Sequence, residues 1–223
     1  MSQLLKFELK KLMHRPRTFL SIGLMLVLVG LIFWGLKSEG ENAMTYVFQS
    51  LGDNFLMQGK ILNGYMVCFL ILNTLWIHIP VLIVIVTADL FCSELETGTI
   101  RLLMTRPISR NRVALAKFFT AVLYVFFFIL IFTSLSLGLA LFLFGSDDLI
   151  VAFNGLQIIP EEDLLWRFFA AFGYAVLAMS TFAIFSVTVS FFTRKALVTI
   201  LITIGVIVIS TLLQTLAASL FFG

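Results

Sequence analysis

Few side chains in this sequence are suited to catalysis, and the best candidates are His78, Asp89 and Glu94. A histidine and two carboxylates can act as general acids and bases when they meet in one site. If the apolar run that holds them is helical, however, His78 and Glu94 lie about 24 Å apart along its axis. A membrane-embedded enzyme is therefore an alternative hypothesis and not the leading one.

Motifs for phosphate, acyl or metal chemistry are missing from the sequence. It contains no G-x-x-x-x-G-K-[ST], GxSxG or HExxH pattern, and no CxxC or HxxxH pair. Cys68 and Cys92 fall in one apolar run and would be about 36 Å apart in a helix, too far for a disulfide. We expect no catalytic residue, metal or cofactor in this chain, so energy for any work must come from a partner or a gradient.

The longest charged interval between apolar runs covers residues 92–112. Each Arg or Lys at the centre of a bilayer costs at least about 2.5 kcal/mol, so this interval lies outside the membrane. Gly98 and Pro107 both disfavour continuous helix, and we predict a short helix over residues 93–104, with Ser109 as the N-cap of the next helix. A solvated turn that serves topology alone is the alternative.

Polar side chains also occur inside the preceding apolar run, at Asn73, Thr74 and His78. Such residues face protein or a water-filled path rather than lipid. Thr74 and His78 are four residues apart and would share a helix face. Hydrogen bonding between helices is the favoured interpretation, and a translocation path is the alternative. We interpret Asp89 as an interfacial carboxylate rather than a proton relay.

The composition places the chain among integral membrane proteins, because 61% of residues are apolar and 12% are charged. We predict an all-α bundle in a single domain over residues 1–223, preceded by an amphipathic interfacial helix over 1–17 rather than a signal peptide. The overlong second span should kink at Pro80, and the third should extend beyond the membrane or break near Ser134, Ser136 and Gly138. The five predicted spans are 18–36, 61–91, 113–145, 164–192 and 196–222.

The distribution of basic residues predicts the orientation. Twelve of the fifteen Lys and Arg residues fall in the N-terminal segment, the central charged interval with Lys117, and the turn at Arg194. Positive loops stay in the cytoplasm, so the N terminus is predicted to be cytoplasmic and Gly223 to lie outside. Because these residues cluster at helix ends, the formal charge of +3 does not indicate a nucleic-acid partner.

The charged interval also resembles the cytoplasmic signature of ABC-2 type transporter permeases, and the helix plan fits that family over nearly the whole chain. The matching residues, in order, are Glu94, Glu96, Gly98, Thr99, Ile100, Leu102, Leu103, Arg106, Pro107, Ile108, Ser109 and Arg110. In that family the segment is a coupling helix that docks on a separate ATP-binding subunit. The resemblance implies that residues 94–107 of this set contact that partner.

The resemblance further implies an exporter in the plasma membrane, with two permease chains and two ATP-binding subunits that bind ATP and Mg²⁺. Members of that family have six membrane spans, whereas five are predicted for this chain, so we expect a further span beyond residue 223. A non-transporting membrane anchor or immunity protein is a third hypothesis. Co-purification with an ATPase separates the transporter from the other two.

Overall fold

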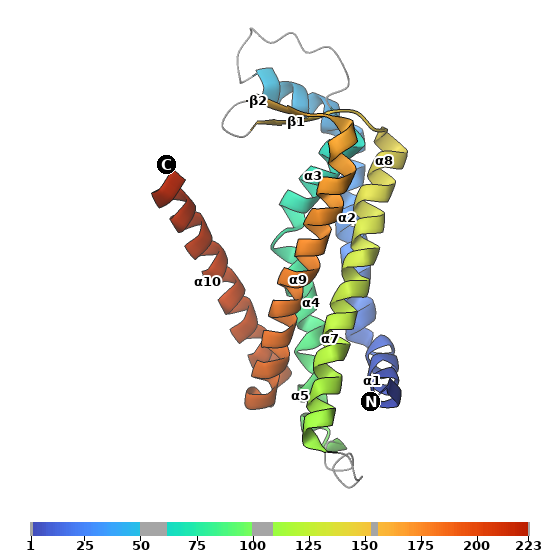
Figure 1. Ribbon diagram of the computed structural model, residues 1–223, viewed down its shortest axis with the longest axis vertical. Coiled ribbons are helices and arrows are strands. Elements are labelled where there is room, and N and C mark those ends of the chain that lie inside the picture. Colours follow the sequence, from blue (N-terminus) through green and yellow to red (C-terminus); the bar gives the residue numbers. More distant parts are fainter. Residues whose placement is uncertain (1, 50–61, 100–108, 153–155, 223) are drawn as a thin grey trace. The chain divides into compact units, whose positions relative to one another are not determined.

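The computed structural model describes residues 2–49, 62–99, 109–152 and 156–222 (Figure 1). Five of its helical stretches are long and apolar enough to cross a membrane. This finding confirms an all-α membrane bundle with five candidate spans. They are Pro16–Gly40, His78–Glu96, Asn111–Phe144, Glu161–Thr193 and Ala196–Ala217.

The N-terminal segment forms two helices, α1 (Ser2–Met13) and α2 (Pro16–Gln49). Pro16 opens α2 at its first position, where the missing N–H costs no hydrogen bond. The predicted interfacial helix over 1–17 therefore ends earlier, at Met13. The predicted end of the first span at residue 36 is not the end of the helix, because α2 continues through residues 37–49. Polar side chains end the apolar run there without ending the helix.

The predicted second span, 61–91, is broken into α3 (Gly64–Leu75), α4 (His78–Thr87) and α5 (Asp89–Glu96). The break lies at Trp76 and Ile77, and Pro80 sits in the first turn of α4. A proline has no N–H for the carbonyl four residues earlier, which here belongs to Trp76. Pro80 thus accounts for an interruption one turn before the position predicted for the kink.

The third span is not broken, since helical structure runs through Asn111–Phe144, but its hydrogen-bond pattern changes at the residues where a break was one of the two predicted outcomes. Helix α7 (Arg110–Thr133) passes into a π-helical turn, η1 (Ser134–Gly138), and then into α8 (Leu139–Phe144). The Ser134 and Ser136 hydroxyls each donate to the carbonyl four residues earlier, at 2.9 and 2.7 Å. Side-chain bonds of this kind compete with the backbone ladder and bend helices.

Two short strands lie in the acidic segment between the third and fourth predicted spans, β1 (Leu149–Ala152) and β2 (Leu156–Ile159). They pair antiparallel with Leu149 opposite Ile159, a hairpin that the all-helical prediction does not contain. Helix α9 (Glu161–Thr193) then begins with three acidic residues, which suit the positive end of a helix dipole. After Arg194 and Lys195 the chain continues as α10 (Ala196–Phe222).

Residue contacts divide the chain into two compact units. The first contains Met1–Ile22, Ile77–Phe128 and Val176–Gly223, and the second contains Gly23–Trp76 and Ile129–Ala175. Helices α2, α7 and α9 contribute to both units. The single domain over 1–223 stays a prediction.

In the second unit, the start of α3 is fixed by a close backbone approach. The Gly64 N–H donates to the Gly145 carbonyl at 2.9 Å, and Asn63 caps α3 by accepting from the Met66 N–H at 2.8 Å. The Asn63 amide also donates to the carbonyl of Asp148 at 2.6 Å. These contacts join the α3 N-terminus to the end of α8, with aromatic packing such as Tyr65 on Phe168 nearby.

Candidate functional site

Helix α5 in the first unit carries the beginning of the charged interval. It ends at Glu96, and the chain then turns through Gly98, whose φ of +71° lies in the left-handed region. The Thr97 N–H still bonds the Ser93 carbonyl at 3.1 Å. The predicted start of a helix at residue 93 is therefore wrong, because Ser93–Glu96 continue a helix that starts at Asp89. Its predicted end at residue 104 lies outside the described residues. Gly98, predicted to disfavour continuous helix, follows the end of α5 in a conformation that glycine adopts without strain.

The structure describes only some of the residues that the sequence assigned to partner binding. Glu94, Glu96, Gly98 and Thr99 are described. The others lie outside the described residues, namely Ile100, Leu102, Leu103, Arg106 and Pro107. Their contact with a partner stays a prediction.

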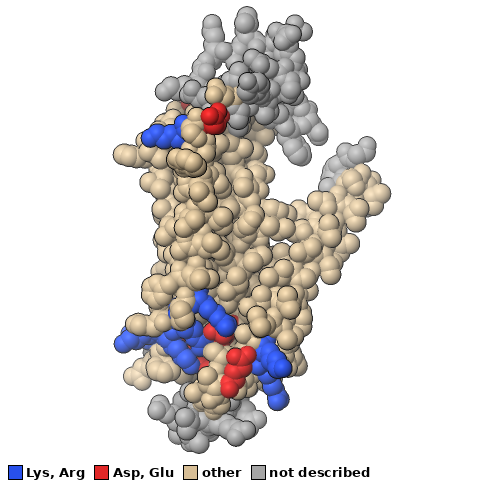
Figure 2. Space-filling view, turned by 180° about the vertical axis from the view of Figure 1, so that it is seen from behind, with Lys and Arg blue, Asp and Glu red and all other residues tan. Residues whose placement is uncertain are grey.

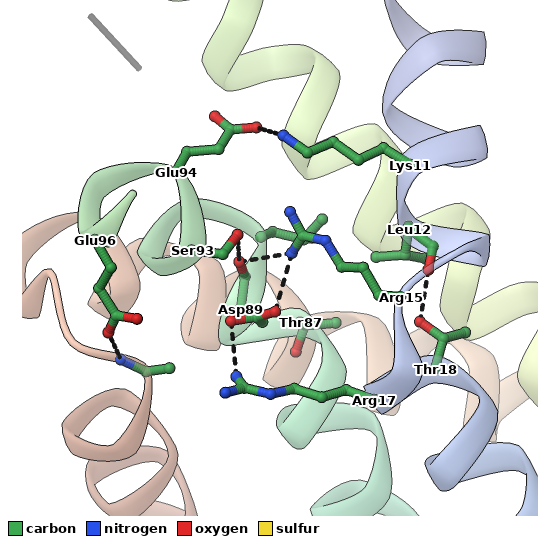
Figure 3. A network of polar contacts seen from close by, with 12 residues as sticks. Lys11, Leu12, Arg15, Arg17, Thr18, Thr87, Asp89, Ser93, Glu94 and Glu96 are labelled. Carbon is green, nitrogen blue, oxygen red and sulfur yellow. Dashed lines mark hydrogen bonds and ion pairs between the residues drawn. The ribbon is translucent and has the colours of Figure 1, made fainter. Parts of the chain in front are cut away.

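Glu94, which the resemblance assigns to partner contact, is buried within this chain. It is 4% exposed, and its Oε1 lies 2.6 Å from Lys11 Nζ and 2.8 Å from Lys117 Nζ. Figure 3 shows the Glu94 side chain directed at Lys11 of α1. Since two cations already hold this carboxylate inside the chain, Glu94 orients α5 and is not free to meet a partner.

Lys117 on α7 is the centre of the buried charges. It is fully buried, and its Nζ donates to the Leu90 carbonyl at 2.8 Å and to Glu8 Oε2 at 3.2 Å. It also lies 5.0 Å from the centroid of the Phe91 ring. Together with Glu94, Lys117 therefore fastens α1 to both α5 and α7. We call Glu8, Lys11, Glu94 and Lys117 the buried ion cluster.

The sequence analysis missed this cluster because it took each charge by itself. Glu8 and Lys11 are three residues apart and so share a face of α1, and Lys117 interrupts an otherwise apolar helix. Those two signals indicate a charged face of α1 and a partner for Lys117. In the space-filling view of Figure 2, basic and acidic side chains lie beside one another on the surface near the lower end of the picture.

Asp89, at the start of α5, is held by two arginines. Arg15 Nη1 donates to the Asp89 carbonyl at 2.8 Å and lies 3.2 Å from Oδ2, and Arg17 Nη1 lies 2.7 Å from Oδ1 (Figure 3). The carboxylate is 7% exposed. This pairing supports a structural carboxylate over a proton relay, because both oxygens of Asp89 are already committed to fixed cations.

Glu96 differs from Glu94, because its side chain is exposed. Its Oε1 accepts from the backbone N–H of Ala196, the first residue of α10, at 3.2 Å (Figure 3). The neighbouring Thr97 and Thr99 hydroxyls are 3.0 Å apart and also exposed. The described surface after α5 thus consists of Glu96–Thr99, which we call the docking segment.

The polar residues proposed for a translocation path are all exposed on this chain. The Asn73 amide donates to the Phe69 carbonyl of its own helix at 2.9 Å, which is not a bond between helices. The predicted common face of Thr74 and His78 is wrong, because the helix breaks between them and each belongs to a different unit. Their role in translocation stays a prediction.

Among the described residues, no three His, Cys, Asp or Glu side chains are grouped so that they could hold a metal ion. The acidic groups of α5 contact Lys and Arg instead. The arrangement at this end of the first unit is thus an ion-paired framework that leaves one carboxylate and a left-handed glycine at the surface.

A comparison with models of known protein families identifies the family of this chain. The chain matches the model of the ABC-2 family transporter protein over residues 3–222. No curated protein and no solved structure matches it. Because the matched range covers almost the entire sequence, this multi-pass membrane protein belongs to the ABC-2 transporter family, whose members are permeases that work with ABC ATPase subunits.

Proposed function

We propose that this chain is the permease subunit of an exporter in the plasma membrane, driven by ATP that a separate subunit hydrolyses. The observation that carries the proposal is the end of α5, where a buried, ion-paired helix terminates in the exposed docking segment. Family membership supplies the transport role and the general class of partner. The geometry of the site supports one particular surface, the docking segment, as the place where the partner would push on this chain.

A contact of this kind needs both an exposed surface and a rigid connection to the helices that move. Glu96 supplies an exposed charge, which can steer and register a partner. Glu94 and Asp89 supply the connection, since they tie the same short helix to α1, to the start of α2 and to α7. Displacement of the docking segment would therefore be passed to three helices at once.

The same contacts support assigning the chemistry to the partner. Asp89 and Glu94, which a membrane enzyme would have to use, are each engaged with two cationic side chains. We propose that the partner binds ATP and Mg²⁺, and that this chain catalyses no reaction. The complex is proposed to hold two permease chains and two ATP-binding subunits, with the N terminus in the cytoplasm as the positive-inside rule indicates.

The proposal is tested by reversing the charge of Glu96. The wild-type chain is purified with its ATP-binding subunit, the 2:2 composition is checked by native mass spectrometry, and ATP-driven transport is measured in vesicles. Glu96→Lys should weaken ATPase binding about tenfold, equivalent to about 1.4 kcal/mol, and reduce transport, with membrane abundance near wild type because exposed charges contribute only about 0–1 kcal/mol to stability.

Glu96→Gln is the matched control, because its amide oxygen can still accept from the Ala196 N–H. If capping of α10 were the role of Glu96, Gln would behave as wild type, and the Lys variant would lose thermal stability rather than partner affinity. Unchanged ATPase binding and transport in Glu96→Lys would contradict the proposal. Loss of the protein from the membrane would instead support a loop that serves folding and topology alone.

A further inference from the structure

The turn between α9 and α10, Thr193–Lys195, contains a backbone conformation that its sequence does not favour. Arg194 has φ +56° and is the only residue other than glycine with positive φ among those the structure describes. A side chain in this region clashes with its own carbonyl, so glycine or asparagine is the usual occupant. Arginine at such a position points to a role for the side chain rather than for the turn.

The turn is held firmly by its neighbours within the first unit. The Thr193 and Thr199 hydroxyls are 2.5 Å apart, and the Cys92 thiol lies 3.4 Å from Thr199 Oγ1 and 3.6 Å from the Ser190 carbonyl. These contacts pack α5 against the turn. A surface that is already ordered binds a partner without the entropic cost of fixing it.

The same turn adjoins the docking segment. Glu96 Oε1 accepts from the Ala196 N–H at 3.2 Å, so the exposed Glu96 lies beside the end of the turn that carries the exposed basic pair Arg194 and Lys195. Neither basic residue forms an ion pair with a described residue. The described surface therefore presents two cations without a described ion-pair partner, next in sequence to the residue whose N–H donates to the Glu96 carboxylate.

We infer that the α9–α10 turn is a second contact for the ATP-binding subunit, which presents carboxylates to Arg194 and Lys195 and a basic group to Glu96. This inference rests on the proposed function. A protein surface can match this mixed pattern of charge, and complementary pairs across an interface set its register. An anionic lipid surface fits it less well, because the carboxylate would repel the headgroups that the two cations attract.

The Arg194→Gly variant removes the arginine side chain but keeps the conformation of the turn, so it distinguishes the two contributions. Glycine adopts the left-handed conformation without strain, so the Tm of this variant should equal or exceed that of wild type. Affinity for the ATP-binding subunit that co-purifies with the wild-type chain should fall about tenfold. Lys195→Gln, which does not touch the left-handed position, should weaken binding in the same direction, whereas Arg194→Lys should retain most of it.

Binding is measured with the full-length chain in nanodiscs of zwitterionic phosphatidylcholine alone, and again with phosphatidylglycerol added. Weaker binding of Arg194→Gly and Lys195→Gln in both lipids supports the inference. It is overturned if the wild type binds and both variants bind equally well, or if the difference appears only with phosphatidylglycerol, which would assign the turn to lipid. Failure of the wild type itself to bind would instead refute the proposed function.

Discussion

Replacing Lys117 with methionine removes the cation at the centre of the buried ion cluster and keeps most of the side-chain volume. Lys11 still lies 2.6 Å from Glu94, so the carboxylate left without a cation is Glu8, which is 2% exposed. Breaking a buried pair by removing one partner costs about 3–5 kcal/mol. For a chain of this length, each kcal/mol corresponds to about 2–4 °C in Tm, so Lys117→Met should lower the Tm by about 6–20 °C.

The triple variant Glu8→Met/Glu94→Met/Lys117→Met provides the matched comparison, because it removes the three buried charges and leaves only Lys11, whose side chain is 35% exposed and can turn to water. Replacing an entire buried ionic group with apolar residues of similar volume is often neutral or stabilising by about 1–4 kcal/mol. The triple variant should therefore be at least as stable as wild type, although it carries two more substitutions than the single variant. This reversal distinguishes an uncompensated charge from simple loss of packing.

Both variants are measured in detergent by intrinsic tryptophan fluorescence during heating, with the proportion of folded protein checked by size-exclusion chromatography. A Lys117→Met chain with the Tm of wild type would show that the cluster contributes nothing to folding. A triple variant as unstable as the single one would show that the loss arises from packing of the lysine stem. Either result would refute the electrostatic account of the cluster.

Two further predictions concern local packing and topology. Gly64→Ala should destabilise the chain by about 1–3 kcal/mol through overpacking, because its Cβ would lie 2.7 Å from carbonyl oxygens of α8 and its C-cap. Gly173→Ala, with open space around its Cβ, should be neutral or stabilising, and equal Tm values for the two would contradict this account. A cysteine introduced at the exposed Asp147 should react with an impermeant maleimide from outside the cell, and one at Lys10 only after permeabilisation. Since both native cysteines are buried, they should not react under these conditions, and the opposite labelling pattern would refute the predicted orientation.

The number of candidate spans followed from the sequence because a bilayer imposes a simple requirement of about 20 apolar residues per span. The π-helical turn at Ser134–Gly138 lies where the sequence allowed a break, although the helix continues through it. The extension of α2 to Gln49 did not follow from the sequence, because hydropathy reports where the apolar run ends and not where the helix ends. The β1–β2 hairpin was missed for a related reason: the flanking acidic residues dominated the interpretation of a short segment.

The buried charges were harder to predict, because they pair residues far apart in the sequence. Glu8 and Lys117 are 109 residues apart, and no local pattern states that α1 packs against α7. Burial of a lysine in an apolar helix does require a partner nearby. The buried lysine therefore indicates that some carboxylate lies nearby, but it does not identify Glu8 as that carboxylate.

Glu94 and Glu96 show why the charged signature could not be interpreted as a uniform surface. In a helix of 3.6 residues per turn, residues two apart point about 200° away from each other. One of the two carboxylates must then face the helices packed against α5 when the other faces outward. Glu94 lies on the buried face of α5, where Lys11 and Lys117 offset its charge. Glu96 lies on the exposed face. The two acids of this signature therefore have different tasks: the first fixes the helix, and the second is the one that a partner can reach.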